Sequence, residues 1–155
     1  MKSWASSISP SDAVVALRSF PRRWRGLLAQ AGEEEDPDGA LRRRPPDGSP
    51  SVHDLLADTV AVLAAADGRL RGVLLGATAS GGSPVVAPGA EVDALATAAE
   101  SLAAQVAGVS SADWERSDDS GTTALDVVRQ AVAAASDNLR QAERTLAQVR
   151  GRPAG

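Results

Sequence analysis

The chain has 155 residues, a formal net charge of −4, one His and no Cys. Without thiols it cannot form disulfides, zinc–thiolate sites, iron–sulfur clusters or a Cys nucleophile, and one His cannot build a His-rich metal centre within one chain. The acidic balance argues against nucleic-acid binding, for which a basic face is typical. The length fits one domain over residues 1–155, with residues 1–10 and 151–155 as flexible ends.

The hydropathy pattern argues against a membrane partner. No run of about 18 apolar residues is present, and the first residues lack the apolar stretch of a secretion signal. We therefore expect a cytoplasmic protein. Alanine contributes 31 residues and aromatic residues only 3% of the chain, which predicts an aliphatic, alanine-rich core.

The first helical segment is predicted over residues 12–30, where apolar residues recur at alternating steps of three and four. Ser11 is expected to cap it, because its hydroxyl can accept an otherwise unpaired N–H of the first turn. Pro21 removes one backbone donor and should kink the helix or split it in two. The expected apolar stripe consists of Val14, Leu17, Pro21, Trp24 and Leu28, widened by Phe20 and Leu27.

Two further helices are predicted over residues 51–75 and 89–108. The first begins with Ser51 and Asp54 in the spacing of a capping box, with Asp in place of the usual Glu. Its apolar face contains Val52, Leu55, Leu56, Thr59, Val60, Leu63, Leu70 and Leu74. That of the second contains Val92, Leu95, Ala99, Leu102 and Val106.

The most regular segment is the last, over residues 123–150, where Thr123 and Asp126 form another capping-box pattern. Its apolar seam consists of Leu125, Val128, Val132, Ala135, Leu139, Ala142, Leu146 and Val149. Alternating steps of three and four suit left-handed packing at about 20°. No segment is long enough and apolar enough to predict a sheet. The expected fold class is all-α, a four-helix bundle.

Three irregular connections join these helices. Residues 31–50 carry acidic and basic runs, which indicate either a charged recognition loop or a solvated, internally balanced loop. The Gly- and Ser-rich residues 76–89 allow either an antiparallel pair or a crossover. Residues 111–116 suggest a single helical turn whose Trp114 plugs the end of the bundle.

Three stretches of the chain resemble the DinB-like superfamily, in particular its actinobacterial branch similar to mycothiol-dependent maleylpyruvate isomerase. They are Arg44-Pro45-Pro46-Asp47-Gly48-Ser49-Pro50-Ser51-Val52-His53-Asp54-Leu55-Leu56-Ala57-Asp58, residues 102–116, and residues 123–142. Their order and spacing cover about 100 residues. The resemblance implies an up-down-down-up bundle with a divalent metal such as zinc or nickel near one end. It also implies a His ligand on the second long helix and a His-x-x-x-His pair, or an acidic variant, on the fourth.

The residues at the family's ligand positions do not match this metal site. These positions fall on Asp58, Ala134 and Asn138. Ala134 has no donor atom, and Asp137 is turned by about 100° from Asn138 on the helix. One carboxylate and one amide could hold Mg²⁺ or Ca²⁺ loosely through water, but not a transition metal tightly. We expect Asp58 and Asn138 either to pair with each other or to face solvent.

The sequence supports two functional hypotheses. The first is a non-catalytic DinB-like protein without a metal or other cofactor, which binds a small ligand or a partner in a pocket near Asp58, Asp137, Asn138 and Trp114, or which forms a homodimer. The second is a mycothiol-dependent transferase or isomerase with a metal-free mechanism. Its base would be Asp58 or His53, although His53 is expected to be exposed and on a different face from Asp58.

Overall fold

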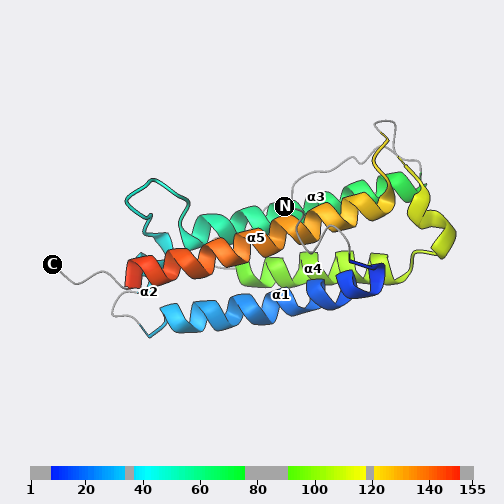
Figure 1. Cartoon of the computed structure of the whole chain (residues 1–155). Coiled ribbons are helices and arrows are strands. Elements are labelled where there is room, and N and C mark those ends of the chain that lie inside the picture. Colours follow the sequence, from blue (N-terminus) through cyan, green and yellow to red (C-terminus); the bar gives the residue numbers. More distant parts are fainter. Residues whose placement is uncertain (1–7, 34–36, 76–90, 118–120, 151–155) are drawn as a thin grey trace.

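The computed structural model describes residues 8–33, 37–75, 91–117 and 121–150. Its elements are the long helices α1 (Pro10–Ala31), α3 (Val52–Leu75), α4 (Glu91–Ala107) and α5 (Ala124–Arg150), the short helix α2 (Pro37–Arg42) and the 3₁₀ helix η2 (Ser111–Glu115) (Figure 1). The predicted all-α fold with four long helices packed together is confirmed. Within the described residues, β pairing is limited to an isolated bridge between Ser117 and Thr123. The predictions for residues 1–7, 76–89 and 151–155 fall outside these ranges.

The four long helices form a ring in which α1 and α3 each pack against both α4 and α5. Ion pairs of Arg18 with Glu100 and of Arg25 with Asp93 show that α1 and α4 are antiparallel. As Figure 1 shows, α3 and α4 run in the same direction, opposite to α1 and α5, so the order is up-down-down-up. The antiparallel alternative left open for the pair α3 and α4 is therefore wrong.

Helix α1 begins two residues earlier than the sequence predicts. The N-cap is Ser9, not Ser11: its Oγ accepts a hydrogen bond of 3.2 Å from the backbone N–H of Asp12. Pro10 then occupies the first turn, where a missing N–H costs nothing because no intrahelical acceptor exists there. Ile8, assigned from the sequence to a flexible end, is buried, and its carbonyl accepts a hydrogen bond of 2.9 Å from Nε of Arg129.

The helix also continues through Pro21 without a break, so the predicted split does not occur. Burial on both sides of the proline explains this, because Phe20 and Trp24 are fully buried and fix the two turns against the core. The buried stripe is rotated relative to the predicted one: Val14, Pro21 and Leu28 are only half-buried. Its members are Ala13, Leu17, Phe20, Trp24, Leu27 and Ala31. The prediction erred because small alanines at Ala13 and Ala31 were not counted as core residues.

Both predicted capping boxes are present. At the start of α3, Oγ of Ser51 accepts from the N–H of Asp54 and a carboxylate oxygen of Asp54 accepts from the N–H of Ser51, each at 3.1 Å. At the start of α5, Thr123 and Asp126 make the same reciprocal bonds at 3.1 and 3.3 Å. An Asp at the third position thus closes the box as Glu does, and the N-terminal ends of α3 and α5 are capped.

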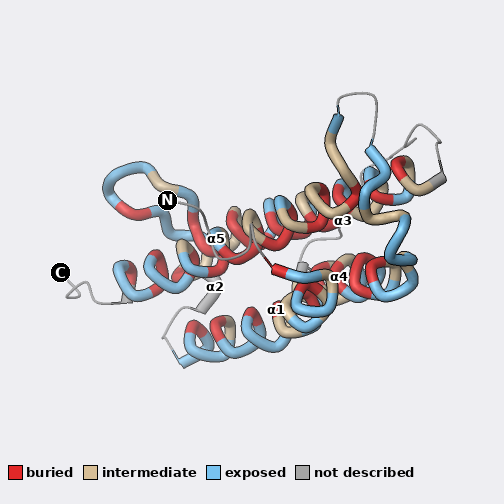
Figure 2. Tube along the Cα trace, turned by 45° about the vertical axis from the view of Figure 1, so that its right-hand side comes forward, coloured by how far each residue is buried: buried red, intermediate tan, exposed pale blue. Residues whose placement is uncertain are grey.

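The predicted seams of the other helices are largely confirmed, as the buried stripes in Figure 2 show. On α5 every predicted seam residue is buried except Leu125, which is half-buried near the end of the helix. On α3 and α4 the exceptions are Leu74 and Val92, which also lie near helix ends and are half-buried. The three exceptions lie within two residues of a helix end, although Val52, Ala124 and Val149 are buried at helix ends as well.

The charged connection between α1 and α3 is not simply a solvated loop. It contains α2, which packs against α1, α3 and α5, and it buries Ala40 and Pro45. Pro37 at the first position of α2 is a typical helix start that the charge pattern obscured. The helical turn predicted at residues 111–116 is confirmed as η2, whose Trp114 is half-buried and packs against the core.

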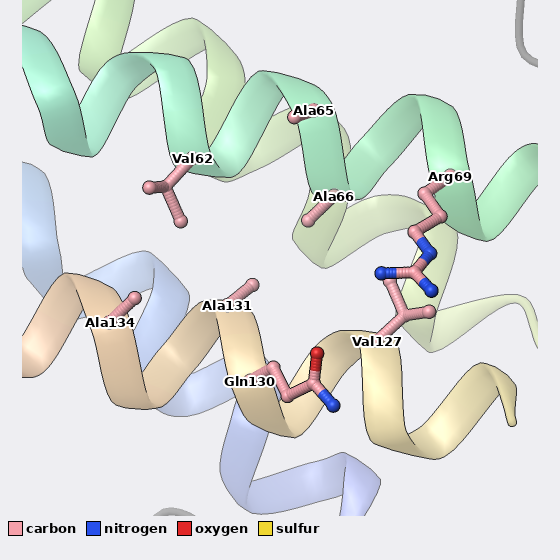
Figure 3. A pocket seen from close by; sticks show the side chains of 8 residues that line it. All are labelled: Val62, Ala65, Ala66, Arg69, Val127, Gln130, Ala131 and Ala134. Carbon is pink, nitrogen blue, oxygen red and sulfur yellow. The ribbon is translucent and has the colours of Figure 1, made fainter. Parts of the chain in front are cut away.

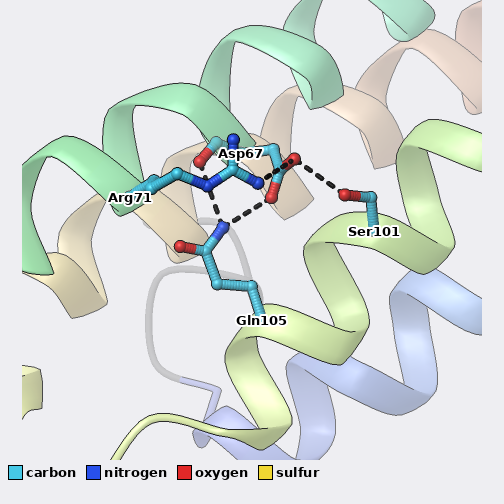
Figure 4. Close-up of polar contacts among 4 residues, drawn as sticks. All are labelled: Asp67, Arg71, Ser101 and Gln105. Atoms are coloured by element: carbon cyan, nitrogen blue, oxygen red, sulfur yellow. Dashed lines mark hydrogen bonds and ion pairs between the residues drawn. The ribbon is translucent and has the colours of Figure 1, made fainter.

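A polar network joins the parallel helices α3 and α4 (Figure 4). Asp67 of α3 accepts hydrogen bonds from Oγ of Ser101 at 2.8 Å and from Nε2 of Gln105, which also donates to the backbone carbonyl of Asp67 at 3.1 Å. Arg71 pairs with the same carboxylate at 3.4 Å. Ser101, Gln105 and Arg71 all donate to the carboxylate of Asp67, so the network fixes the register of α3 and α4. Helix α3 also packs against α5.

Candidate functional site

A pocket of about 300 Å³ lies between α3 and α5 and opens to solvent (Figure 3). This volume is at the lower limit of small-molecule sites, which span about 300–1,000 Å³. The two helices are antiparallel and contribute four residues each. The lining consists of Val62, Ala65, Ala66, Arg69, Val127, Gln130, Ala131 and Ala134.

Opposed alanines create this pocket. Ala65 and Ala66 of α3 line the pocket together with Ala131 and Ala134 of α5, and Figure 3 shows Val62 pointing from α3 toward α5 beside them. Two helices held apart by larger side chains elsewhere cannot close around methyl groups, so space remains between them. The floor of the pocket is therefore apolar.

Arg69 and Gln130 are the polar residues that line the pocket. Nη2 of Arg69 donates a hydrogen bond of 3.1 Å to Oγ1 of Thr122, just before the start of α5. Val127, in the first turn of α5, lines the same end, and the side chain of Gln130 stands at the rim beside it (Figure 3). The guanidinium of Arg69 thus lies near the N-terminus of α5, whose first turn also contains the carboxylate of Asp126.

Beyond the other end, Asp58 and Asn138 form a polar pair. Nδ2 of Asn138 donates to Oδ2 of Asp58 at 2.8 Å and to Oγ1 of Thr59 at 3.1 Å. Thr59 is fully buried, and its hydroxyl donates in turn to the carbonyl of Leu55 at 2.7 Å. Of the two arrangements expected from the sequence, the structure contains the pair, although Asp58 itself is exposed.

The three positions that the family resemblance assigns to metal ligands lie on facing sides of α3 and α5. Ala134 precedes Asn138 by one helical turn and lines the pocket, while Asp58 precedes Val62 by one turn on the opposite helix. The donor set does not fit a divalent metal, because Ala134 has no donor atom and Asn138 directs an N–H at Asp58. Within the described ranges, no group of three or more His, Cys, Asp or Glu side chains could hold a metal ion.

The structure does not bring the remaining predicted residues to this pocket. Asp137 is exposed and lies one position around the helix from Asn138. Trp114 belongs to η2 beside the start of α5, where the N–H of Ala124 donates to the carbonyl of Arg116 at 2.7 Å. From there to Asn138 is about 21 Å along α5. Among the described residues, Trp114 thus lies well away from Asp58 and Asn138 and is not among the residues that line the pocket between α3 and α5.

His53 lies in the first turn of α3 and is half-buried, not exposed as expected. Five residues of helix separate it from Asp58, which turns the two side chains about 140° apart, as expected. It does not line the pocket. The sequence analysis did not identify Arg69 and Gln130 as pocket residues. Their one indication in the sequence is a spacing of three or four residues from alanines that also line the pocket.

Comparisons with known proteins give no relative. No protein-family model matches the chain, and no curated protein or solved structure is significantly similar to it. None of the helices in the described part of the chain is long and apolar enough to cross a bilayer.

Proposed function

We propose that this chain is a DinB-like bundle without the family's metal centre, and that it acts by binding a small ligand in the pocket between α3 and α5. The observation that carries the proposal is the hydrogen bond between Asn138 and Asp58 beside Ala134. The bond joins the facing helices α3 and α5 at two of the three positions that the resemblance assigns to metal ligands, and neither these residues nor Ala134 form a metal-binding set. The up-down-down-up order of the helices also agrees with the family pattern.

The lining of the pocket supports binding over catalysis. Ala, Val and Gln side chains carry no nucleophile and no group that exchanges protons near neutral pH. Arg69 is always protonated and can attract an anion but cannot act as a general base. The carboxylate of Asp58, one helical turn before Val62, accepts a hydrogen bond from Asn138. A shaped apolar site with one fixed charge suits recognition of a ligand.

The family assignment is tested by restoring the metal site. The triple variant Asp58→His, Ala134→His, Asn138→His should bind zinc or nickel tightly, because His at i and i+4 share a helix face with a third ligand opposite. The matched control replaces Arg140 in place of Asn138, which moves one His by about 200° around α5, away from the position of Ala134. Isothermal titration should show tight binding to the first variant alone. Equal affinities for the two variants would refute the alignment and the family assignment.

The metal content of the wild-type protein gives a second test. We expect the purified chain to contain no stoichiometric zinc or nickel by plasma mass spectrometry. Near-stoichiometric metal that disappears in Asp58→Ala would overturn the proposal of a metal-free protein and would favour a catalytic one.

Ligand binding in the pocket is tested with alanine methyl labels read by NMR. A neutral apolar probe such as octanol should shift the methyl signals of Ala131 and Ala134, and should leave unchanged that of Ala103, which is buried on α4. Absence of any shift at Ala131 and Ala134 up to the solubility of the probe would contradict a ligand site here.

A further inference from the structure

We infer that the ligand of this pocket is a small uncharged molecule with one hydrogen-bonding group. Its apolar part lies on the alanine floor, and its polar group lies at the rim beside Gln130. This inference rests on the proposed function and adds the chemical class and orientation of the ligand.

The first step is the burial of the residues that line the pocket. The buried ones, Ala66, Val127 and Ala131, are all apolar. The two polar ones, Arg69 and Gln130, are both exposed. A polar group placed among the buried side chains would lose its hydration without a side-chain partner, which is unfavourable. The part of the ligand that enters the pocket is therefore apolar, and its polar group stays at the rim.

The second step is the balance of charge at the end of the pocket near the start of α5. A guanidinium can attract an anion, but that of Arg69 already donates to Oγ1 of Thr122, and Arg69 has a further interaction besides this bond. The carboxylate of Asp126 lies at the same end, in the first turn of α5. Because one cation and one anion lie together here, an anionic head gains little attraction to offset its lost hydration.

The opposite end does not favour a cationic head. Asp58 does not line the pocket: it lies one turn before Val62, and its exposed carboxylate accepts a hydrogen bond from Nδ2 of Asn138. An ammonium group that paired with Asp58 would lie outside the pocket, where an exposed ion pair contributes little. At the rim the same ammonium group would meet Arg69.

The third step is the polar group that remains, the amide of Gln130. It stands at the rim on the side of α5 (Figure 3), and an amide both donates and accepts hydrogen bonds without carrying a charge. Val62 and Arg69 are seven residues apart on α3, which is about 10 Å along the helix axis. Together with a volume of about 300 Å³, this span fits a short chain or a single ring that bears one hydroxyl, carbonyl or amide group.

The experiment compares three probes with the same apolar chain: octanol, octanoate and octylamine. Each is titrated into the wild-type chain at pH 7, and the methyl shifts of Ala131 and Ala134 are followed by NMR. We expect octanol to bind at least ten-fold more tightly than either charged probe. Octanoate or octylamine binding as tight as that of octanol would overturn the uncharged class while leaving the pocket as a site. No shift with any of the three probes would overturn the proposed ligand site itself.

Two variants then test where the polar group lies. Gln130→Lys places a cation at the rim and should raise octanoate affinity about two- to five-fold, the range of an exposed ion pair. Gln148→Lys is the matched control, because Gln148 is also exposed on α5 but lies about 27 Å further along the helix. It should leave octanoate affinity unchanged. Equal octanoate affinities of the two variants would overturn the placement of the polar group beside Gln130.

Discussion

Asn138 of α5 and Asp58 of α3 are joined by a hydrogen bond of 2.8 Å from Nδ2 to Oδ2, and the same amide nitrogen donates to Oγ1 of Thr59 at 3.1 Å. One amide thus connects two helices at two points, at the end of the pocket where the family pattern would place a metal. The pair is a directional contact between α3 and α5. It lies one helical turn after Ala134, which lines the pocket.

The pair can be tested by exchanging donor and acceptor. Asn138→Asp removes the N–H donor and places a second carboxylate beside that of Asp58. We expect the free energy of unfolding to fall by about 1–2 kcal/mol at pH 7, because a hydrogen bond is lost and like charges approach. The double variant Asp58→Asn, Asn138→Asp restores one donor and one acceptor and should recover most of the loss. Urea unfolding measures both; additive losses in the double variant would show that the two side chains do not interact.

Two buried threonines provide a second prediction. Oγ1 of Thr145 is buried and has no hydrogen-bond partner among the described residues. Thr145→Val removes this unpaired hydroxyl at nearly constant shape and helix propensity, so the free energy of unfolding should rise by about 1 kcal/mol.

Thr59→Val is the matched control for Thr145→Val. The Thr59 hydroxyl is equally buried, but it donates to Leu55 and accepts from Asn138. Its loss should lower the free energy of unfolding by about 1 kcal/mol. Thermal melts that shift in the same direction for both variants would refute this account of the Thr145 hydroxyl.

The sequence predicts the fold well because long helices carry their signal in many residues. The seam on α5 repeats over seven steps, and both capping boxes mark helix starts that the structure confirms. Errors arose where a signal was local or weak. Pro21 predicted a break that burial of Phe20 and Trp24 prevents, and the short helix α2 was hidden in a run of charges.

The candidate site was less predictable for a physical reason. Periodicity shows that Ala65, Ala66, Ala131 and Ala134 are apolar, but it does not show that two alanine stretches lie opposite each other and leave space. The pairing of Asp58 with Asn138 came from the family resemblance, not from spacing within one helix. Trp114 was expected near Asp58 and Asn138 because the sequence does not give the distance between the end of the bundle and its middle.

Acid sensitivity offers a third prediction, centred on the capping box of α3. The pKa of Asp54 is held below its usual value, chiefly by the backbone N–H of Ser51; burial opposes this, and the Ser51 hydroxyl, Arg44 and His53 lower it further. Because the folded-state pKa is depressed, this stabilisation is present above the unfolded-state pKa of about 3.9 and is lost as pH falls through the folded value. Asp54→Asn should therefore weaken the loss of stability as the pH falls through the unfolded-state pKa of about 3.9 toward the lower folded-state value.

The control for Asp54→Asn is Asp137→Asn, which neutralises an exposed carboxylate on α5. The pKa of Asp47 is also lowered, by the hydroxyl and the N–H of Ser49, and this contribution persists in both variants. Urea unfolding from pH 7 to pH 3 should show a shallower slope for Asp54→Asn than for Asp137→Asn. Identical slopes would mean that the capping box does not contribute to acid unfolding.

The last prediction concerns the seam of α5. Leu139 is fully buried among the core residues, one position after Asn138, so Leu139→Ala should lower the free energy of unfolding by about 2–5 kcal/mol through lost burial and a residual cavity. Leu125 belongs to the same repeat but is half-buried at the end of the helix, and Leu125→Ala should cost no more than about 1.5 kcal/mol. Denaturant unfolding measures both losses. A larger loss for Leu139→Ala than for Leu125→Ala indicates a seam that is buried in its middle, and equal losses indicate a seam that is buried along its whole length. A loss below about 0.5 kcal/mol at Leu139 would contradict the packing of α5 against its neighbours, and with it the geometry that opens the pocket.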